Sequence, residues 1–264
     1  MGVIPEKIFR ELVKNVYDGI NLSKIAIVIL WTLLGLFFIN KRTSHMYAVL
    51  FGLLFYISLL ILCLVLFKDI KRYLSFPKDS RILPRFIGYK QDIIFVYPIL
   101  LMSVIGAINN LLIASGLFPK VIQNMNVTPI EPIEFVARIS LLPFVAVSEE
   151  LLNLIIVSLY YNRMKFLGSI RLPVSIFIAS LTFGIMHSVG WGLNTGILIG
   201  LSYMPVFFIT LYTGNVWISL LAHFYNDFIS VSKSYYGSFH FIIIASLCLM
   251  PFIWAIRTMV RKTD

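Results

Sequence analysis

The sequence predicts an all-α membrane protein: a polytopic bundle of about eight transmembrane helices, with an N-terminal amphipathic helix in the membrane interface. Hydrophobic residues make up 59% of the 264 residues and charged residues only 13%, whereas about a quarter of a soluble domain is charged. The mean hydropathy is +0.90. Apolar segments near the ~20 residues that a helix needs to cross a bilayer recur along the chain. These observations exclude an ordinary soluble domain.

The first 20 residues predict the amphipathic helix. Apolar residues recur at helical spacing between Val3 and Ile20, with charged residues such as Lys7 and Glu11 between them. The same mixture argues against a signal peptide. We expect this helix to lie in the membrane interface, and docking on the loops of the same protein is the alternative.

Eight apolar segments follow, and each is a candidate membrane span. The two shortest, 173–188 and 215–231, could be partly re-entrant, because non-helical backbone is tolerated where it lines a cavity. The loop 119–134 contains three prolines and is expected to be irregular. The eight segments are 24–40, 45–67, 93–118, 135–161, 173–188, 193–213, 215–231 and 239–256.

We divide the chain into three regions. Residues 1–134 hold the amphipathic helix and three accessory spans, residues 135–231 hold the spans with buried polar residues, and residues 232–264 hold the last span and a basic tail. Cys63 and Cys248 both lie in apolar segments, and we expect neither to form a disulfide or to bind a metal.

The basic residues lie between the apolar segments. The net charge of +10 suits anionic lipid and membrane topology better than nucleic acid, because no separate basic surface with interleaved aromatic residues is present. With eight spans, 17 Lys and Arg residues fall on one side and four on the other, and Arg138 lies inside the fourth span. The side with the excess is cytoplasmic. We therefore expect both termini in the cytoplasm, and the Ile-, Asn-, Lys- and Phe-rich composition suggests a bacterial plasma membrane.

Five ionisable residues lie well inside apolar segments: Glu149, Glu150, His187, His223 and Asp227. A charge near the centre of a bilayer costs on the order of a few kcal/mol, so such residues usually face a cavity and take part in chemistry or transport. At a rise of 1.5 Å per residue, they lie at similar depths in their segments. We predict that they form one site.

The spacing within each helix indicates how these residues face one another. Phe183 and His187 are four residues apart, as are His223 and Asp227, so each pair shares a helix face. The two adjacent glutamates differ by about 100° around the helix axis. They are therefore expected to have different roles.

A carboxylate and imidazoles held away from bulk water can hydrolyse an amide bond, with a base to deprotonate a water and donors or a metal to stabilise the oxyanion. Each feature alone has a simpler explanation. Phe183 could face lipid, His223 with Asp227 could be a polar pair between helices, and the glutamates could relay protons. Their joint occurrence at one depth favours catalysis.

Three motifs in this region resemble those of the CPBP (Abi) intramembrane endopeptidases, which include the CAAX prenyl endopeptidases and bacterial bacteriocin-processing and self-immunity proteins. The family pattern is a double glutamate with an arginine four residues after the second, then FxxxH, then HxxxN or HxxxD. The chain has Glu149-Glu150, Phe183 to His187 and His223 to Asp227 in this order. The resemblance covers roughly 135–231.

The resemblance implies that Glu149 activates a water with His187 beside it, while His223 and Asp227 stabilise the oxyanion. The resemblance does not decide whether the reaction uses a cofactor. The alternatives are no metal and a zinc ion held by these four residues; the HExxH pattern of a committed zinc site is absent from the sequence. The residues expected to support the site are Glu150, Asn153, Phe183 and Asn226.

The chain departs from the family pattern at two positions. Leu154 stands where the family has arginine, so Glu150 would need another partner, such as Asn153 or Arg138. Asp227 replaces the usual asparagine, and a carboxyl group can donate to an oxyanion only when it is protonated.

Two functions follow from the sequence. The first is an intramembrane peptidase that acts on a small peptide or a membrane-associated protein. The second is a catalytically degenerate membrane scaffold, immunity or regulatory protein, which the leucine at 154 suggests. A proton-coupled transporter is a third class, but it predicts internal repeats or paired discontinuous helices, which the sequence does not show.

Overall fold

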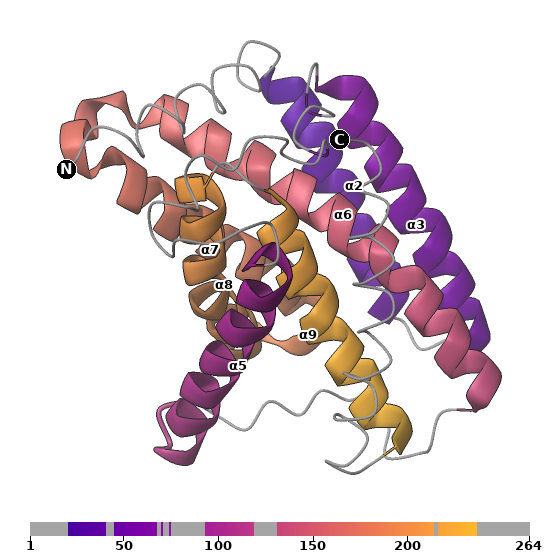
Figure 1. Cartoon of the computed structure of the whole chain (residues 1–264). Coiled ribbons are helices and arrows are strands. Elements are labelled where there is room, and N and C mark those ends of the chain that lie inside the picture. The colour runs from indigo at the N-terminus through magenta and orange to yellow at the C-terminus, as the bar shows by residue number, and fades with distance from the viewer. Residues whose placement is uncertain are drawn as a thin grey trace, which may run out of the picture.

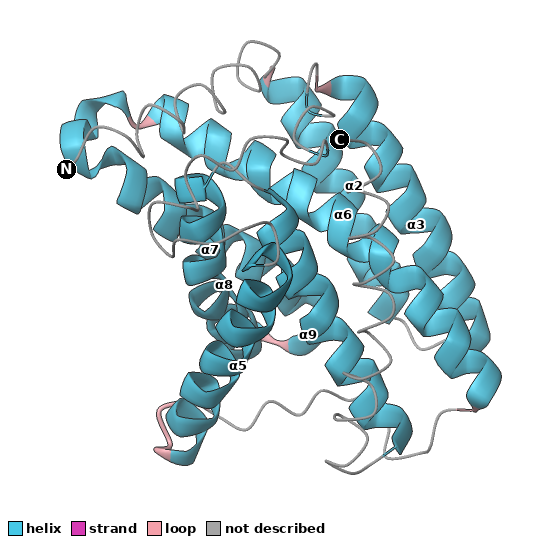
Figure 2. Ribbon diagram, viewed as in Figure 1, coloured by secondary structure: helices cyan, strands magenta, loops and turns pink. Residues whose placement is uncertain are grey.

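The computed structural model describes residues 21–40, 45–67, 70, 74, 93–118, 131–213 and 216–236. In these residues the protein is all-helical, as the composition predicts, and Figure 2 shows no strand among them. The elements (Figure 1) are α2 (Leu22–Asn40), α3 (His45–Leu66), α5 (Ile93–Ala114), α6 (Pro132–Arg163), the short 3-10 helix η2 (Lys165–Ile170), α7 (Arg171–Trp191), α8 (Leu193–Thr213) and α9 (Val216–Tyr236).

Four stretches of the described chain are long and apolar enough to cross a membrane. Large apolar side chains on α2 and α3 are exposed, among them Leu54 at 70% and Val65 at 74%. Exposed apolar surface of this extent suits contact with lipid better than contact with water. The protein is therefore an integral membrane protein. The four stretches are Leu22–Ile39, Tyr47–Leu66, Pro132–Arg163 and Lys165–Trp191.

Two expected elements lie outside the described residues: the N-terminal amphipathic helix and the span 239–256. The eight-span arrangement and the placement of both termini therefore stay predictions. α5 and α8 contribute shorter apolar stretches, Leu101–Ala114 and Leu193–Phe208.

The two segments for which the sequence left a re-entrant path open form α-helices, α7 and α9. α7 and α9 each contain 21 residues, longer than the apolar segments 173–188 and 215–231, because flanking residues such as Arg171, Trp191 and Lys233 also take helical conformation. Gly192 follows the last residue of α7, and its positive φ of 83° is a conformation that glycine adopts at little cost. α8 then begins at Leu193, so α7 and α8 form a tight helical hairpin.

α6 is the central helix of the bundle. It is 32 residues long, and Pro132 lies in its first turn, where the missing N–H of proline costs nothing. In Figure 1 it runs between the α2–α3 pair and the group formed by α7, α8 and α9, and it contacts α3, α7 and α9. Every residue from Ser148 to Ser158 is buried. A helix that is buried on all sides belongs to the core of a large assembly of helices.

Three glycines let α7 and α8 approach until their backbones touch. A Cβ atom on Gly200 would lie 2.7 Å from the carbonyl oxygen of Ser180, and one on Gly184 would lie 2.6 Å from the backbone nitrogen of Gly200. Gly196 and Gly200 have the small-xxx-small spacing that packs membrane helices closely. The contact holds the helix that carries His187 firmly against α8.

Alanine at these glycines is expected to destabilise the bundle. Gly184→Ala and Gly200→Ala should lower the melting temperature of the purified protein in detergent, because overpacking a tight contact typically costs about 1–3 kcal/mol. Gly106→Ala on α5 is the matched control, since a Cβ there meets no described atom within 4 Å. Equal melting temperatures for the three variants would contradict the close α7–α8 contact.

Candidate active site

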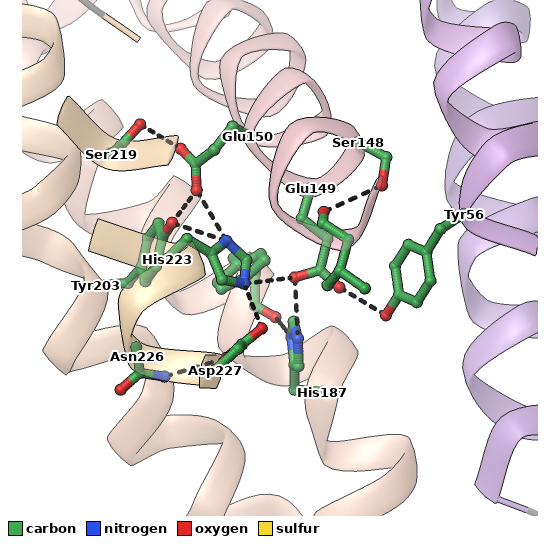
Figure 3. Close-up of polar contacts among 12 residues, drawn as sticks. Tyr56, Ser148, Glu149, Glu150, His187, Tyr203, Ser219, His223, Asn226 and Asp227 are labelled. Carbon is green, nitrogen blue, oxygen red and sulfur yellow. Dashed lines mark hydrogen bonds and ion pairs between the residues drawn. The ribbon is translucent and has the colours of Figure 1, made fainter. Parts of the chain in front are cut away.

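Three helices bring together the four residues predicted to be catalytic. Glu149 lies on α6, His187 on α7, and His223 and Asp227 on α9 (Figure 3). Glu149 Oε2 is 3.5 Å from His187 Nε2 and 3.4 Å from His223 Nε2. Asp227 Oδ2 lies 3.4 Å from the same nitrogen of His223. All four side chains therefore meet at one point between α6, α7 and α9.

The two carboxylate oxygens of Glu149 have different surroundings. The residue is 4% exposed, and Oε1 accepts a 2.8 Å hydrogen bond from the hydroxyl of Tyr56 on α3. Oε2 accepts no hydrogen bond from the described residues. Because an unpaired buried acceptor costs ~1–3 kcal/mol, Oε2 is the atom best placed to bind and deprotonate a small polar molecule.

Glu150 points to a different side of α6 and has its own partners (Figure 3). Its Oε2 accepts a 2.5 Å hydrogen bond from Ser219 Oγ on α9. Its Oε1 accepts a hydrogen bond from the hydroxyl of Tyr203 on α8 and lies 3.0 Å from His223 Nδ1. Both oxygens are thus bound by groups from α8 and α9.

The partners expected for Glu150 from the sequence were wrong. Arg138 pairs instead with Glu134, one turn earlier on α6, at 2.6 Å. Asn153 is 1% exposed, and its amide makes no hydrogen bond with the described residues. Leu154, at the position of the family arginine, is buried in the hydrophobic core. Residue spacing along α6 identifies partners on that helix only, whereas the hydrogen-bond donors to Glu150 lie on α8 and α9.

Both imidazoles present Nε2 to Glu149. His187 Nδ1 lies 2.9 Å from the carbonyl oxygen of Phe183. A carbonyl can only accept a hydrogen bond, so the network assigns the hydrogen to Nδ1. His223 Nδ1 faces the carboxylate of Glu150 in the same way. In each ring Nε2 is therefore the atom that can exchange a proton with Glu149 or with a substrate.

Aromatic rings hold the imidazoles in place. The Phe183 ring lies with its centroid 4.4 Å from that of His187, 4.8 Å from that of Tyr203 and 6.3 Å from that of His223. Trp191, at the end of α7, packs against His187 at 5.4 Å. The Phe183 ring thus packs against both imidazoles and against Tyr203.

Asp227 marks the open side of the site. Its side chain is 27% exposed, compared with 11% for His187 and 5% for Glu149. Asn226 is exposed and donates a 3.2 Å hydrogen bond to Asp227 Oδ1, so its contact with the site is indirect. Asp227 is therefore the most accessible of these three side chains.

Tyr56, Tyr203 and Ser219 contact the glutamates but were not found by sequence reasoning. The chain contains 13 tyrosines, and hydroxyl groups are common in apolar helices. No motif or spacing distinguishes these three residues from the others. A search for every tyrosine and serine inside the apolar segments would have included them among many residues without a role.

The arrangement suits acid–base chemistry, because three carboxyl groups and two imidazoles form one connected cluster with contacts of 3.0 to 3.5 Å. Proton transfer in such a cluster requires groups within hydrogen-bonding reach or separated by one water. In the part of the chain that the structure describes, no group of three or more His, Cys, Asp or Glu side chains has the arrangement of a metal site.

Leu154→Arg would restore the family arginine, but it is expected to destabilise the protein. Leu154 is 3% exposed, and the oxygens of Glu150 already have three partners, so the new charge would be buried without compensation. Leu154→Met, which keeps the volume, is the matched control. Melting temperatures in detergent test this, and an arginine variant as stable as the methionine variant would contradict it.

Comparison with known proteins gives one match. Residues 131–229 match the family described as type II CAAX prenyl endopeptidase, Rce1-like. The matched segment contains the double glutamate, the motif that ends at His187 and the motif that ends at Asp227. No curated protein and no solved structure matches the chain. The similarity to this family therefore spans the segment that carries Glu149, His187, His223 and Asp227.

Proposed function

We propose that the protein is an intramembrane endopeptidase that hydrolyses a peptide bond with a water molecule activated by Glu149 and His187. The observation that carries the proposal is the position of Glu149 Oε2. This buried oxygen accepts no hydrogen bond from the described residues and faces two imidazole nitrogens at 3.4 and 3.5 Å. A base held beside groups that exchange protons is what activation of water requires. The match to a protease family supports a hydrolase in general.

The proposed reaction consumes one water. Glu149 Oε2 takes a proton from the water while the water oxygen bonds to the carbonyl carbon of the scissile peptide, and the carbonyl oxygen becomes an oxyanion. His187 Nε2, beside Oε2, orients the water. When the C–N bond breaks, the proton on Glu149 passes to the leaving amine. The products are a carboxylic acid and an amine, and Glu149 returns to its first state.

We propose that His223 and Asp227 stabilise the oxyanion of the substrate. The Nδ1 atom of His223 is held by Glu150 at 3.0 Å, and Nε2 points toward the reacting side of the cluster. A protonated Nε2 donates an N–H to the oxyanion from a fixed position, which is the way preorganised donors stabilise such a charge. Asp227 lies on the same face of α9, with its Oδ2 3.4 Å from His223 Nε2, so it can contact the same oxyanion.

The contacts of Glu150 favour an enzyme over a degenerate scaffold. The scaffold alternative rests on Leu154 in place of the family arginine, which would leave Glu150 without a partner on α6. Tyr203, Ser219 and His223 bind both of its oxygens instead. The loss of the arginine is therefore compatible with an intact site.

We propose a small peptide or a membrane-associated protein as the substrate, because the site is built on helices of which α6 and α7 are apolar enough to cross a membrane. A prenylated CAAX-type peptide is the first substrate to test, since the matching family is one of prenyl endopeptidases. From the Ile-, Asn-, Lys- and Phe-rich composition we also propose a bacterial plasma membrane. From the distribution of Lys and Arg we propose that both termini lie in the cytoplasm.

Glu149→Gln is expected to abolish the general base while keeping the size of the side chain. Hydrolysis of a fluorogenic prenylated CAAX-type peptide by the purified protein should fall by at least about 100-fold, the range typical of acid–base catalysis. Glu134→Gln, a buried carboxylate on α6 outside the site, is the matched control and should retain activity. Equal activity of wild type and Glu149→Gln would refute the proposal.

Asp227→Asn introduces the residue that the family usually has and is expected to retain activity within about tenfold. An amide always has N–H donors for an oxyanion, whereas a carboxyl group has one only when protonated. Asp227→Leu, of similar size but without polar atoms, should lose most activity. Measured values of kcat/KM decide this, and a leucine variant more active than the asparagine variant would overturn the role of Asp227.

A further inference from the structure

Tyr56 on α3 reaches Glu149 from the side opposite the histidines, as Figure 3 shows. Its side chain is buried, with 9% of the residue exposed. The hydroxyl donates a 2.8 Å hydrogen bond to Glu149 Oε1. The ring is itself fixed by Phe55, with centroids 4.8 Å apart in an edge-to-face contact. A rigid donor from α3 therefore acts on the carboxylate that we propose as the base.

A carboxylate needs such a contact to present one chosen oxygen. The last torsion of a glutamate side chain is broad and nearly two-fold, so the carbon skeleton alone does not select the orientation. Among the described residues, Tyr56 is the hydrogen-bond donor to Oε1, and no donor binds Oε2. Tyr56 thus anchors one oxygen and leaves the other facing His187 and His223.

We propose that Tyr56 is a positioning residue for Glu149, which orients Oε2 toward the reacting water; this inference rests on the function proposed above. Tyr56 lies outside residues 131–229, which match the protease family. The active site is therefore completed by α3, a helix from the N-terminal half of the chain.

The test is Tyr56→Phe, which keeps the ring and its packing but removes the hydroxyl. With the fluorogenic prenylated CAAX-type peptide and the full-length protein in lipid nanodiscs, kcat should fall by roughly 10- to 100-fold with little change in KM. This range is expected from the loss of a hydrogen bond to a charged group and misorientation of a base. In a Glu149→Gln background the same change should have no further effect on kcat.

Tyr160→Phe is the matched control. The Tyr160 hydroxyl also makes a 2.9 Å hydrogen bond between helices, from α6 to Thr182 on α7, but it does not touch Glu149. Its loss should leave kcat near the wild-type value. Equal losses of kcat in the two variants would mean that Tyr56 acts only through stability of the bundle, and would overturn the proposal.

Infrared spectroscopy separates this inference from the proposed activity. The difference spectrum between wild type and Glu149→Gln isolates the carboxyl bands of Glu149. Tyr56→Phe should shift these bands, and Tyr160→Phe should not. If the wild type cleaves no peptide but the bands shift, the substrate or the enzymatic function is wrong while the Tyr56–Glu149 contact stands. Unshifted bands contradict the inference whether or not the protein is active.

Discussion

Glu149 and Glu150 are adjacent carboxylates buried inside an apolar bundle, and carboxylates in such a place are stable only when other groups pair with them. Neighbouring residues of a helix point about 100° apart, so the two side chains need separate sets of partners. The first meets groups from α3, α7 and α9, and the second meets groups from α8 and α9. Four helices therefore have to pack around the middle of α6, which explains why α6 is buried there on all sides.

The direct contact between the backbones of α7 and α8 makes this packing rigid. Because Gly184, Gly196 and Gly200 have no side chains, the two helices approach closely enough for Phe183 of α7 to pack against Tyr203 of α8. Tyr203 in turn lies 3.2 Å from His223 Nδ1. The orientation of the imidazoles is thus set by apolar and aromatic packing as much as by hydrogen bonds. Such preorganisation is the condition under which fixed donors stabilise a developing charge.

Leu154 stands where the motif of the CPBP endopeptidases, which the sequence resembles, has arginine, and the second glutamate is stabilised differently from what that motif implies. An arginine on α6 would supply a positive charge from the same helix, whereas here neutral hydroxyls on Tyr203 and Ser219 donate from two neighbouring helices. Hydroxyl groups avoid the cost of burying a further charge, and their hydrogen bonds tie α6 to α8 and α9. The same hydroxyls that donate hydrogen bonds to Glu150 therefore also hold the bundle together around His223.

The sequence by itself determined the helical membrane class and the helices that carry the site, because both follow from local properties: hydrophobicity, helix length and residues four apart. It also indicated that Glu149, His187, His223 and Asp227 belong together, because ionisable residues are rare in apolar segments. Only the tertiary structure decided the partners of Glu150 and the contact of Tyr56 with Glu149. These contacts join residues between 53 and 93 positions apart, and the spacing within a single helix carries no information about which side chains of other helices will face it.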